Sequence, residues 1–154
     1  MDEKQYLSKE KYKELSGELE SLRTEKRKEV AEKLEFAKSL GDLSENAEYQ
    51  EARDDQAKVE DRIMNLEAIL KTAEIVSYKS GDTVEVGSTV VVKKKGSKEK
   101  QTFSIVGSEE VDMASGKISN KSPLGIAFLG KTKNDDVVCN TPKGDILYTI
   151  VSIK

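Results

Sequence analysis

The sequence predicts an α+β protein in two parts: an antiparallel α-helical coiled-coil hairpin over residues 1–78 and a small β-rich globular domain over residues 79–154. Residues 8–75 contain no Pro and only two Gly, and their Glu, Lys, Leu and Ala content favours helix. After residue 78, β-branched runs alternate with turns rich in Gly, Lys and Ser. The charge changes there too, from 20 acidic and 14 basic residues before the boundary to 9 acidic and 12 basic residues after it.

Apolar residues in the helical region recur with the alternating three- and four-residue spacing of a coiled coil. In the second half of the region the seam positions are 49, 52, 56, 59, 63, 66, 70 and 73. In the first half the seam residues are Tyr12, Leu15, Leu19 and Leu22, followed after a gap by Val30, Leu34 and Ala37. The slip near Lys26 predicts a stutter in the first helix.

A helix-stop and helix-start signal lies between the two halves. Gly41 suits the residue after a helix end, and Asp42 or Ser44 can cap a new helix. The flanking segments, residues 9–39 and 45–74, have nearly equal lengths and would pair as a hairpin about 45 Å long at 1.5 Å per residue. The tip of this hairpin is residues 41–46.

Five β-branched runs follow a linker at residues 78–82. They are residues 83–86, 89–92, 102–106, 136–139 and 145–153. Pro142 and Gly144 predict a tight turn that joins the last two runs as a β-hairpin. Ser122 followed by Pro123 predicts the start of one short helix over residues 124–129.

The composition excludes several classes of function. The chain has no His and one Cys, which removes Ser/His/Asp and Cys/His catalysis, most zinc chemistry and any intramolecular disulfide. Neither half is basic enough for an autonomous nucleic-acid binder. No apolar run approaches the ~20 residues of a membrane span, and the first residues lack a signal-type apolar stretch. We therefore expect a cytoplasmic protein with no membrane partner.

Two carboxylates at the tip, Asp42 and Glu45, have two interpretations. The spacing is that of a capping box, in which Asp42 accepts a hydrogen bond from the backbone N–H of Glu45. Alternatively, two exposed carboxylates can co-ligate a hard cation such as Mg²⁺. Since Mg²⁺ prefers six oxygen ligands, the tip would be half a site that a larger enzyme completes. A purely structural coiled coil explains the rod equally well.

The motif of residues 41–49, followed by Ala52 and Arg53, resembles the signature of the bacterial Gre transcript cleavage factors. A second block, residues 122–131, and the segment 136–144 resemble the family's C-terminal domain. The resemblance covers nearly the whole chain. It implies an FKBP-like fold for the C-terminal domain and bacterial RNA polymerase as the partner of a monomeric factor.

The resemblance also implies a mechanism. The C-terminal domain would dock at the rim of the polymerase secondary channel, with Ser122, Pro123 and Gly130 as docking residues, and the hairpin would pass down the channel. Asp42 and Glu45 would act as catalytic residues by sharing a Mg²⁺ ion with the polymerase, which would cleave the 3′ end of backtracked nascent RNA. Arg53 and Asn46 would lie near that RNA, and Asn46 would also brace the tip loop. The factor would not be an enzyme by itself.

Three other functions remain open at the level of the sequence. A channel-binding relative that inhibits polymerase would not need the pair Asp42 and Glu45. A peptidyl-prolyl isomerase needs an aromatic-lined pocket, whereas the C-terminal part has only Phe103 and Phe128 and no Trp. A plain coiled-coil adaptor would not need the motif of residues 41–49.

Overall fold

The computed structural model describes residues 3–42, 45–77 and 81–154. Its helices are α1 (Lys9–Ser21), η1 (Leu22–Lys26), α2 (Arg27–Ser39), α3 (Ala47–Lys71), η2 (Ser108–Glu110), η3 (Met113–Ser115) and α4 (Pro123–Phe128). Its strands are β1 (Gln5–Leu7), β2 (Ala73–Ile75), β3 (Thr89–Lys94), β4 (Lys100–Val106), β5 (Lys117–Ser119), β6 (Asp136–Thr141) and β7 (Gly144–Ile153). The predicted α+β class, a long helical hairpin followed by a strand-rich domain, is confirmed. Leu43 and Ser44 of the tip motif, and residues 78–80 of the predicted linker, lie outside the described residues.

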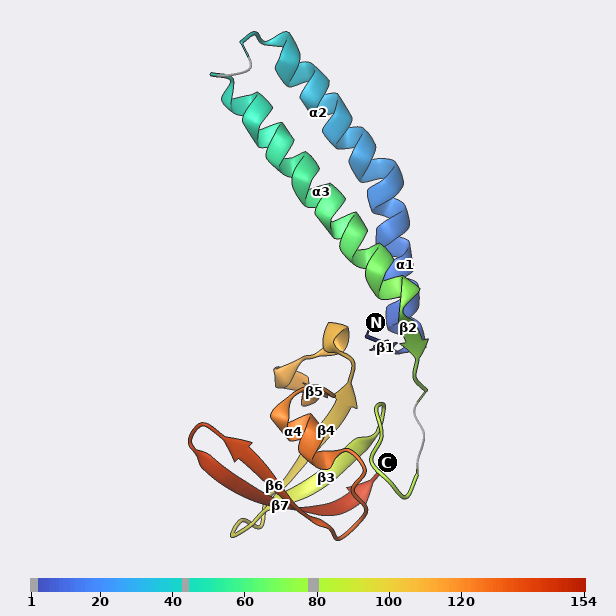
Figure 1. Cartoon of the computed structure of the whole chain (residues 1–154), viewed down its shortest axis with the longest axis vertical. Helices are drawn as coiled ribbons and strands as arrows, with labels where there is room; N and C mark the ends of the chain where they lie inside the picture. The colour runs from blue at the N-terminus through green and yellow to red at the C-terminus, as the bar shows by residue number, and fades with distance from the viewer. Residues whose placement is uncertain (1–2, 43–44, 78–80) are drawn as a thin grey trace. The chain divides into compact units, whose positions relative to one another are not determined.

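The hairpin forms one compact unit, Tyr12–Thr72. In this unit α2 and α3 run side by side in opposite directions (Figure 1). Its buried apolar residues are Leu15, Leu19, Val30 and Ala37 from the first arm, with Ala52, Val59, Ile63, Leu66 and Ile69 from α3. The predicted seam is therefore confirmed over most of its length. At its far end the prediction was wrong, because Ile69 is buried and Leu70 only partly so, and position 73 lies in β2, beyond the end of α3 at Lys71.

The predicted stutter is confirmed as a turn of π-helix, η1, between α1 and α2. A π turn holds one residue more than an α turn, so it absorbs an insertion within an otherwise continuous helix. Leu22 and Val30 are eight positions apart, one more than a heptad, and the extra residue falls inside η1. The π turn thereby keeps the buried face of α2 aligned with that of α1.

The second compact unit consists of residues Met1–Lys11 and Ala73–Lys154. Its main sheet has the strand order β5-β4-β3-β7-β6. The pairs are antiparallel except for β4 with β5, which is parallel. The core of the unit is formed by side chains from the sheet, from α4 and from the segment before β3: Val84, Val90, Val92, Ile105, Ile118, Phe128, Val137, Cys139, Tyr148 and Ile150.

The strand predictions were right for four of the five runs. The run at residues 83–86 is not a strand, because only Thr83 pairs there, in an isolated bridge with Thr132. The fifth strand of the sheet is instead β5, whose three residues are too few to give a periodic signal in the sequence. The turn before Gly144 and the helix that begins at Pro123 are confirmed.

The N-terminal segment contributes to the strand-rich unit, which the sequence did not predict. β1 pairs in parallel with β2, and Leu7 is fully buried. A Cβ placed on Gly107 would lie 1.8 Å from the carbonyl oxygen of Tyr6, so the absence of a side chain there permits this close approach. The contacts thus group residues 73–77 with the strand-rich unit, while a boundary after residue 78 remains a prediction.

Candidate functional site at the hairpin tip

The candidate site lies at the closed end of the hairpin, where the chain leaves α2 and enters α3 (Figure 1). α2 ends at Ser39, and Gly41 follows with φ of 122°, a conformation that L side chains rarely adopt. The predicted helix stop is therefore confirmed. Asp42 and Glu45 are both exposed to solvent in the turn that follows.

Asn46 caps α3, and this overturns the capping-box interpretation of the two acids. The Asn46 Oδ1 atom accepts a hydrogen bond from the backbone N–H of Tyr49 at 3.1 Å, and the helix begins at Ala47. A capping box on Asp42 would require Glu45 to occupy the third position of the helix, whereas Glu45 precedes the helix. Asp42 is therefore not the cap residue of α3, and a capping box does not explain the spacing of the two acids.

The Asn46 side chain also reaches back to the first arm. Its Nδ2 atom donates to the carbonyl oxygen of Ala37 at 2.6 Å. That carbonyl belongs to the last turn of α2, where it also accepts a hydrogen bond from the backbone N–H of Leu40 at 3.1 Å. The prediction that Asn46 braces the tip is thus supported by two hydrogen bonds in the structure.

Arg53 lies on α3, seven residues beyond Asn46 and therefore about 10 Å further along the helix axis. Its guanidinium is exposed and donates to Oε1 of Gln56 at 3.2 Å. Arg53 is therefore available on the hairpin surface but does not contact the tip carboxylates through any described hydrogen bond. Proximity of Arg53 or Asn46 to RNA stays a prediction.

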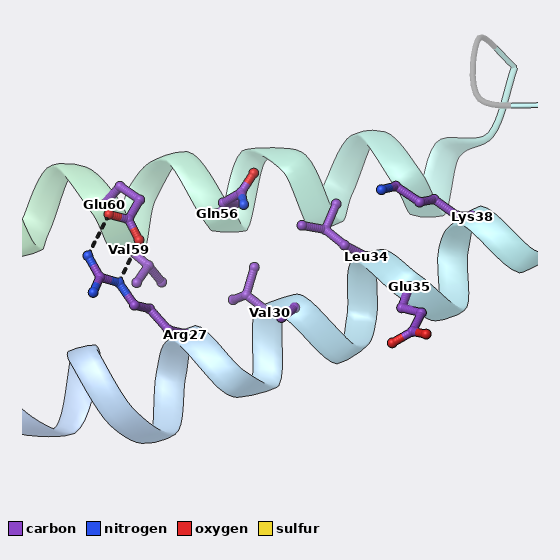
Figure 2. Close-up of a pocket in the computed structure, with 9 residues that line it drawn as sticks. Arg27, Val30, Leu34, Glu35, Lys38, Gln56, Val59 and Glu60 are labelled. Atoms are coloured by element: carbon purple, nitrogen blue, oxygen red, sulfur yellow. Dashed lines mark hydrogen bonds and ion pairs between the residues drawn. The ribbon is translucent and has the colours of Figure 1, made fainter.

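A groove lies between α2 and α3 below the tip (Figure 2). Its volume is about 620 Å³, and Val30, Leu34 and Val59 form its apolar part. Arg27 and Glu60 close one end with two hydrogen bonds of 2.9 Å. Hydrogen bonding to the Arg27 guanidinium holds the pKa of the Glu60 carboxyl below its ordinary value. This ion pair joins the two arms and helps to fix their register.

The tip offers a partial donor set for a hard cation. Asp42 and Glu45 carry carboxylate oxygens, which Mg²⁺ prefers, and both are exposed. Within residues 3–42, 45–77 and 81–154, no group of three or more Asp, Glu, Cys or His side chains is arranged to hold a metal. Two carboxylates supply only part of the six-oxygen shell that Mg²⁺ prefers, so a Mg²⁺ ion shared with another molecule stays a prediction.

The three predicted docking residues lie at the two ends of α4 in the strand-rich unit. Ser122 caps α4: its Oγ accepts from the backbone N–H of Gly125 at 3.0 Å and donates to the carbonyl oxygen of Ser119 at 2.6 Å. The Ser122 hydroxyl is thus used inside the fold. Pro123 and Gly130 are exposed at either end of the helix. The docking role of all three stays a prediction.

The sequence reasoning missed two features near the tip. The first is the capping role of Asn46, although Asn is among the preferred N-cap residues. The second is an exposed apolar pair on α2 and its C-cap, Phe36 and Leu40, which are 62% and 53% exposed. These residues are spaced four apart and lie off the buried seam, which is the signal that could have revealed them.

The fold and the tip define a class of protein: a two-armed helical rod with two exposed carboxylates at its closed end, in a chain that continues into a strand-rich domain. No helix in the described part of the chain has the length and apolar character needed to cross a bilayer. Comparison with known families assigns this class. A model described as "Transcription elongation factor, N-terminal" matches residues 5–75, and one described as "Transcription elongation factor, GreA/GreB, C-term" matches residues 79–154.

Two relatives named GreA match nearly the whole chain in sequence. Transcription elongation factor GreA of Clostridium acetobutylicum is 50% identical over 144 residues, 92% of this chain and 91% of the relative. GreA of Roseiflexus castenholzii is 43% identical over 155 residues, 99% of each chain. A solved structure of GreA factor homolog 1 (Gfh1) of Thermus thermophilus is 30% identical, covers 99% of each chain and has a TM-score of 0.45. The chain belongs to the GreA/GreB family of transcription elongation factors.

Proposed function

We propose that this chain enters the secondary channel of bacterial RNA polymerase and stimulates Mg²⁺-dependent endonucleolytic cleavage of the 3′ end of backtracked nascent RNA. Arrested complexes would thereby resume elongation from a new 3′ end. The observation that carries this proposal is the pair Asp42 and Glu45, exposed at the closed end of a helical rod and not used for helix capping. The 25 residues of α3 give the rod a length of about 37 Å.

The chain's own residues would divide the work. The strand-rich domain would dock at the channel rim, with Pro123 and Gly130 on its exposed surface. The hairpin would carry Asp42 and Glu45 to the polymerase active centre, where each carboxylate would supply oxygen ligands in trans. A Mg²⁺ ion held there would supply Lewis acidity that stabilises charge on the attacking and leaving oxygens of the phosphodiester. Arg53, further along α3, would lie within reach of RNA phosphates.

The proposal treats the chain as a donor of ligands and not as an enzyme. Mg²⁺ prefers six oxygen ligands, and Asp42 and Glu45 can supply only part of that set, which supports this view. Because bacterial RNA polymerase works in the cytoplasm, the proposed function implies a cytoplasmic protein. We therefore expect the purified chain alone to leave RNA intact at any Mg²⁺ concentration, and a robust nuclease activity of the isolated chain would contradict ligand donation in trans.

The test uses purified backtracked polymerase with labelled RNA. Asp42→Asn and Glu45→Gln keep side-chain size but remove charge, and each should abolish RNA shortening while leaving polymerase binding intact. Glu51→Gln, on the exposed surface of α3, is the matched control and should shorten RNA as the unaltered chain does. Undiminished cleavage by the two tip variants would overturn the ligand assignment, and inhibition by the unaltered chain would favour an inhibitor of the channel.

A further inference from the structure

Asn46 joins the two arms of the hairpin near the tip. Its side chain is half-buried and makes hydrogen bonds in two directions. The Oδ1 atom accepts from the Tyr49 backbone N–H at 3.1 Å, and the Nδ2 atom donates to the Ala37 carbonyl oxygen at 2.6 Å. One planar amide therefore ties the first turn of α3 to the last turn of α2.

The two candidate metal ligands lie between these anchor points. Asp42 and Glu45 are both exposed, so burial contributes little to fixing their positions. Ala37 is 1% exposed and belongs to the packed seam of the hairpin. Closing the turn against a packed residue lowers the number of conformations open to the segment that carries the acids. Ligands that are held in advance lose less entropy when a metal and a substrate assemble around them.

We propose that Asn46 is a positioning residue for cleavage, and that the donor half of its amide holds Asp42 and Glu45 in the arrangement the reaction needs. This inference rests on the proposed function of the tip. Both ends of the Asn46 amide are engaged within the fold, which favours a positioning role over direct contact with RNA. Asn46 acts through the two carboxylates and is not itself a catalytic residue.

The capping and joining roles can be separated because they use different atoms. Asp and Ser are as good as Asn at the N-cap, so Asn46→Asp and Asn46→Ser keep an acceptor for Tyr49. Neither carries an amide donor for the Ala37 carbonyl. Asp adds a charge and Ser does not. An effect that both variants share is therefore due to the loss of the amide donor and not to the charge. Asn65→Asp, on the exposed surface of α3, adds the same charge away from the tip and is the control.

Cleavage by backtracked polymerase is measured as a function of factor and Mg²⁺ concentration. With Asn46→Asp and Asn46→Ser, we expect the maximal rate at saturating factor to fall about tenfold or more, as misplaced groups cost in other enzymes. The half-saturating factor concentration should stay within about threefold of the value for the unaltered chain. That concentration changes when binding to polymerase is weakened, and these substitutions leave the binding surface intact. Asn65→Asp should match the unaltered chain. A residue that only stabilises the fold would change the half-saturating concentration or the melting curve instead, and that pattern would overturn the proposal.

A second readout does not depend on cleavage. Backbone relaxation by NMR on the full chain reports the order of Asp42 and Glu45 directly. We expect lower order parameters at both residues in Asn46→Asp and Asn46→Ser than in the unaltered chain, and no change in Asn65→Asp. Unchanged order at the tip would overturn the positioning role. If the unaltered chain fails to stimulate cleavage, the proposed function falls, and the relaxation data alone then decide whether Asn46 orders the two carboxylates.

Discussion

At the scale of single residues, Gly17 is a position where the hairpin can be made more stable. It is exposed inside α1, and a Cβ built on it would meet no atom within 4 Å. Gly costs a helix interior more backbone entropy than Ala does. We therefore expect Gly17→Ala to raise the unfolding free energy of the hairpin by about 0.5–1 kcal/mol, measured by denaturant titration with far-UV circular dichroism. An unchanged or lower value would mean that Gly17 has a role other than filling a helix position.

At Gly107, unlike Gly17, there is no room for a side chain, so a substitution there tests the packing of the N-terminal strand β1. A Cβ there would lie 1.8 Å from the backbone oxygen of Tyr6, which is too close for any real contact. Gly107→Ala should therefore push β1 away and destabilise the strand-rich unit by about 1–3 kcal/mol, as overpacking does elsewhere. Hydrogen exchange of the backbone N–H of Val76, which donates to the Leu7 carbonyl at 2.8 Å, is the local measurement. Unchanged protection of that N–H would contradict the close packing of β1.

We expect Asp135 to contribute to the acid sensitivity of the strand-rich unit. Its carboxylate accepts from the backbone N–H of Thr132 at 2.8 Å and from the Thr132 hydroxyl at 3.0 Å. These hydrogen bonds, the backbone one first, hold the pKa of the Asp135 carboxyl below its ordinary value. A carboxyl with a lowered pKa in the folded state contributes stability above its ordinary pKa, and this contribution is lost as the pH falls through the folded value.

The substitution Asp135→Asn removes this titration while keeping an oxygen acceptor for Thr132. The unfolding free energy should then depend less steeply on pH below about pH 4, where the ordinary carboxyl begins to protonate. Denaturant titrations at several pH values between neutrality and this acid range measure the slope. A slope equal to that of the unaltered chain would exclude Asp135 as a source of the acid sensitivity.

At the scale of elements, the π turn η1 leads to a prediction about chain length. Leu22 and Val30 are one residue further apart than a heptad, and η1 holds the surplus. Deleting the exposed Thr24 should convert η1 into ordinary α-helix without rotating the seam residues on either side. We expect this deletion to preserve the melting temperature of the hairpin or to raise it.

The control for this deletion lies outside the π turn. Deleting Glu32, an exposed residue of α2, would rotate the following residues by about 100° and turn Ala37 away from α3. The hairpin should then lose cooperative melting in far-UV circular dichroism. Equal effects of the two deletions would contradict the idea that η1 absorbs an inserted residue.

The elements that the sequence predicted well are those with long-range periodicity. The seam of α3 repeats over several heptads, so the sequence alone predicts the burial of Ala52, Val59, Ile63 and Leu66, which the structure confirms. The sequence did not predict β1 and β2, because each strand has only three residues and its parallel partner is separated from it in the sequence by the entire hairpin. Periodicity within a segment carries no information about such a partner.

The sequence predicted the tip only in part, because the local motif is visible in the sequence and the contact between the arms is not. The motif of residues 41–49 located Asp42 and Glu45, and Gly41 marked the helix end. The start of α3 was placed two residues too early, since several residues near the turn are acceptable caps and only the tertiary contact with Ala37 distinguishes Asn46. The bond that joins the arms depends on the packing of two helices, which local sequence preferences do not encode.

At the scale of the whole molecule, the chain has two separate hydrophobic cores. Residues Tyr12–Thr72 form one compact unit, and Met1–Lys11 with Ala73–Lys154 form the other. Ile63 is 2% exposed in the first core, and Ile150 is fully buried in the second. A chain with two cores is expected to unfold in more than one step, because each core can be lost without the other.

Matched substitutions test this independence. Ile63→Ala and Ile150→Ala remove the same groups from equally buried sites, and each should destabilise its own unit by about 2–5 kcal/mol. Far-UV circular dichroism follows the helices of the hairpin, while near-UV signals follow the ring cluster of Phe103, Phe128 and Tyr148 in the strand-rich unit. We expect Ile63→Ala to shift the first signal alone and Ile150→Ala to shift the second. If the hairpin unfolds by itself, the strand-rich docking domain stays folded, so Ile63→Ala should retain polymerase binding while losing cleavage. Coincident shifts of both signals in either variant would contradict separate units.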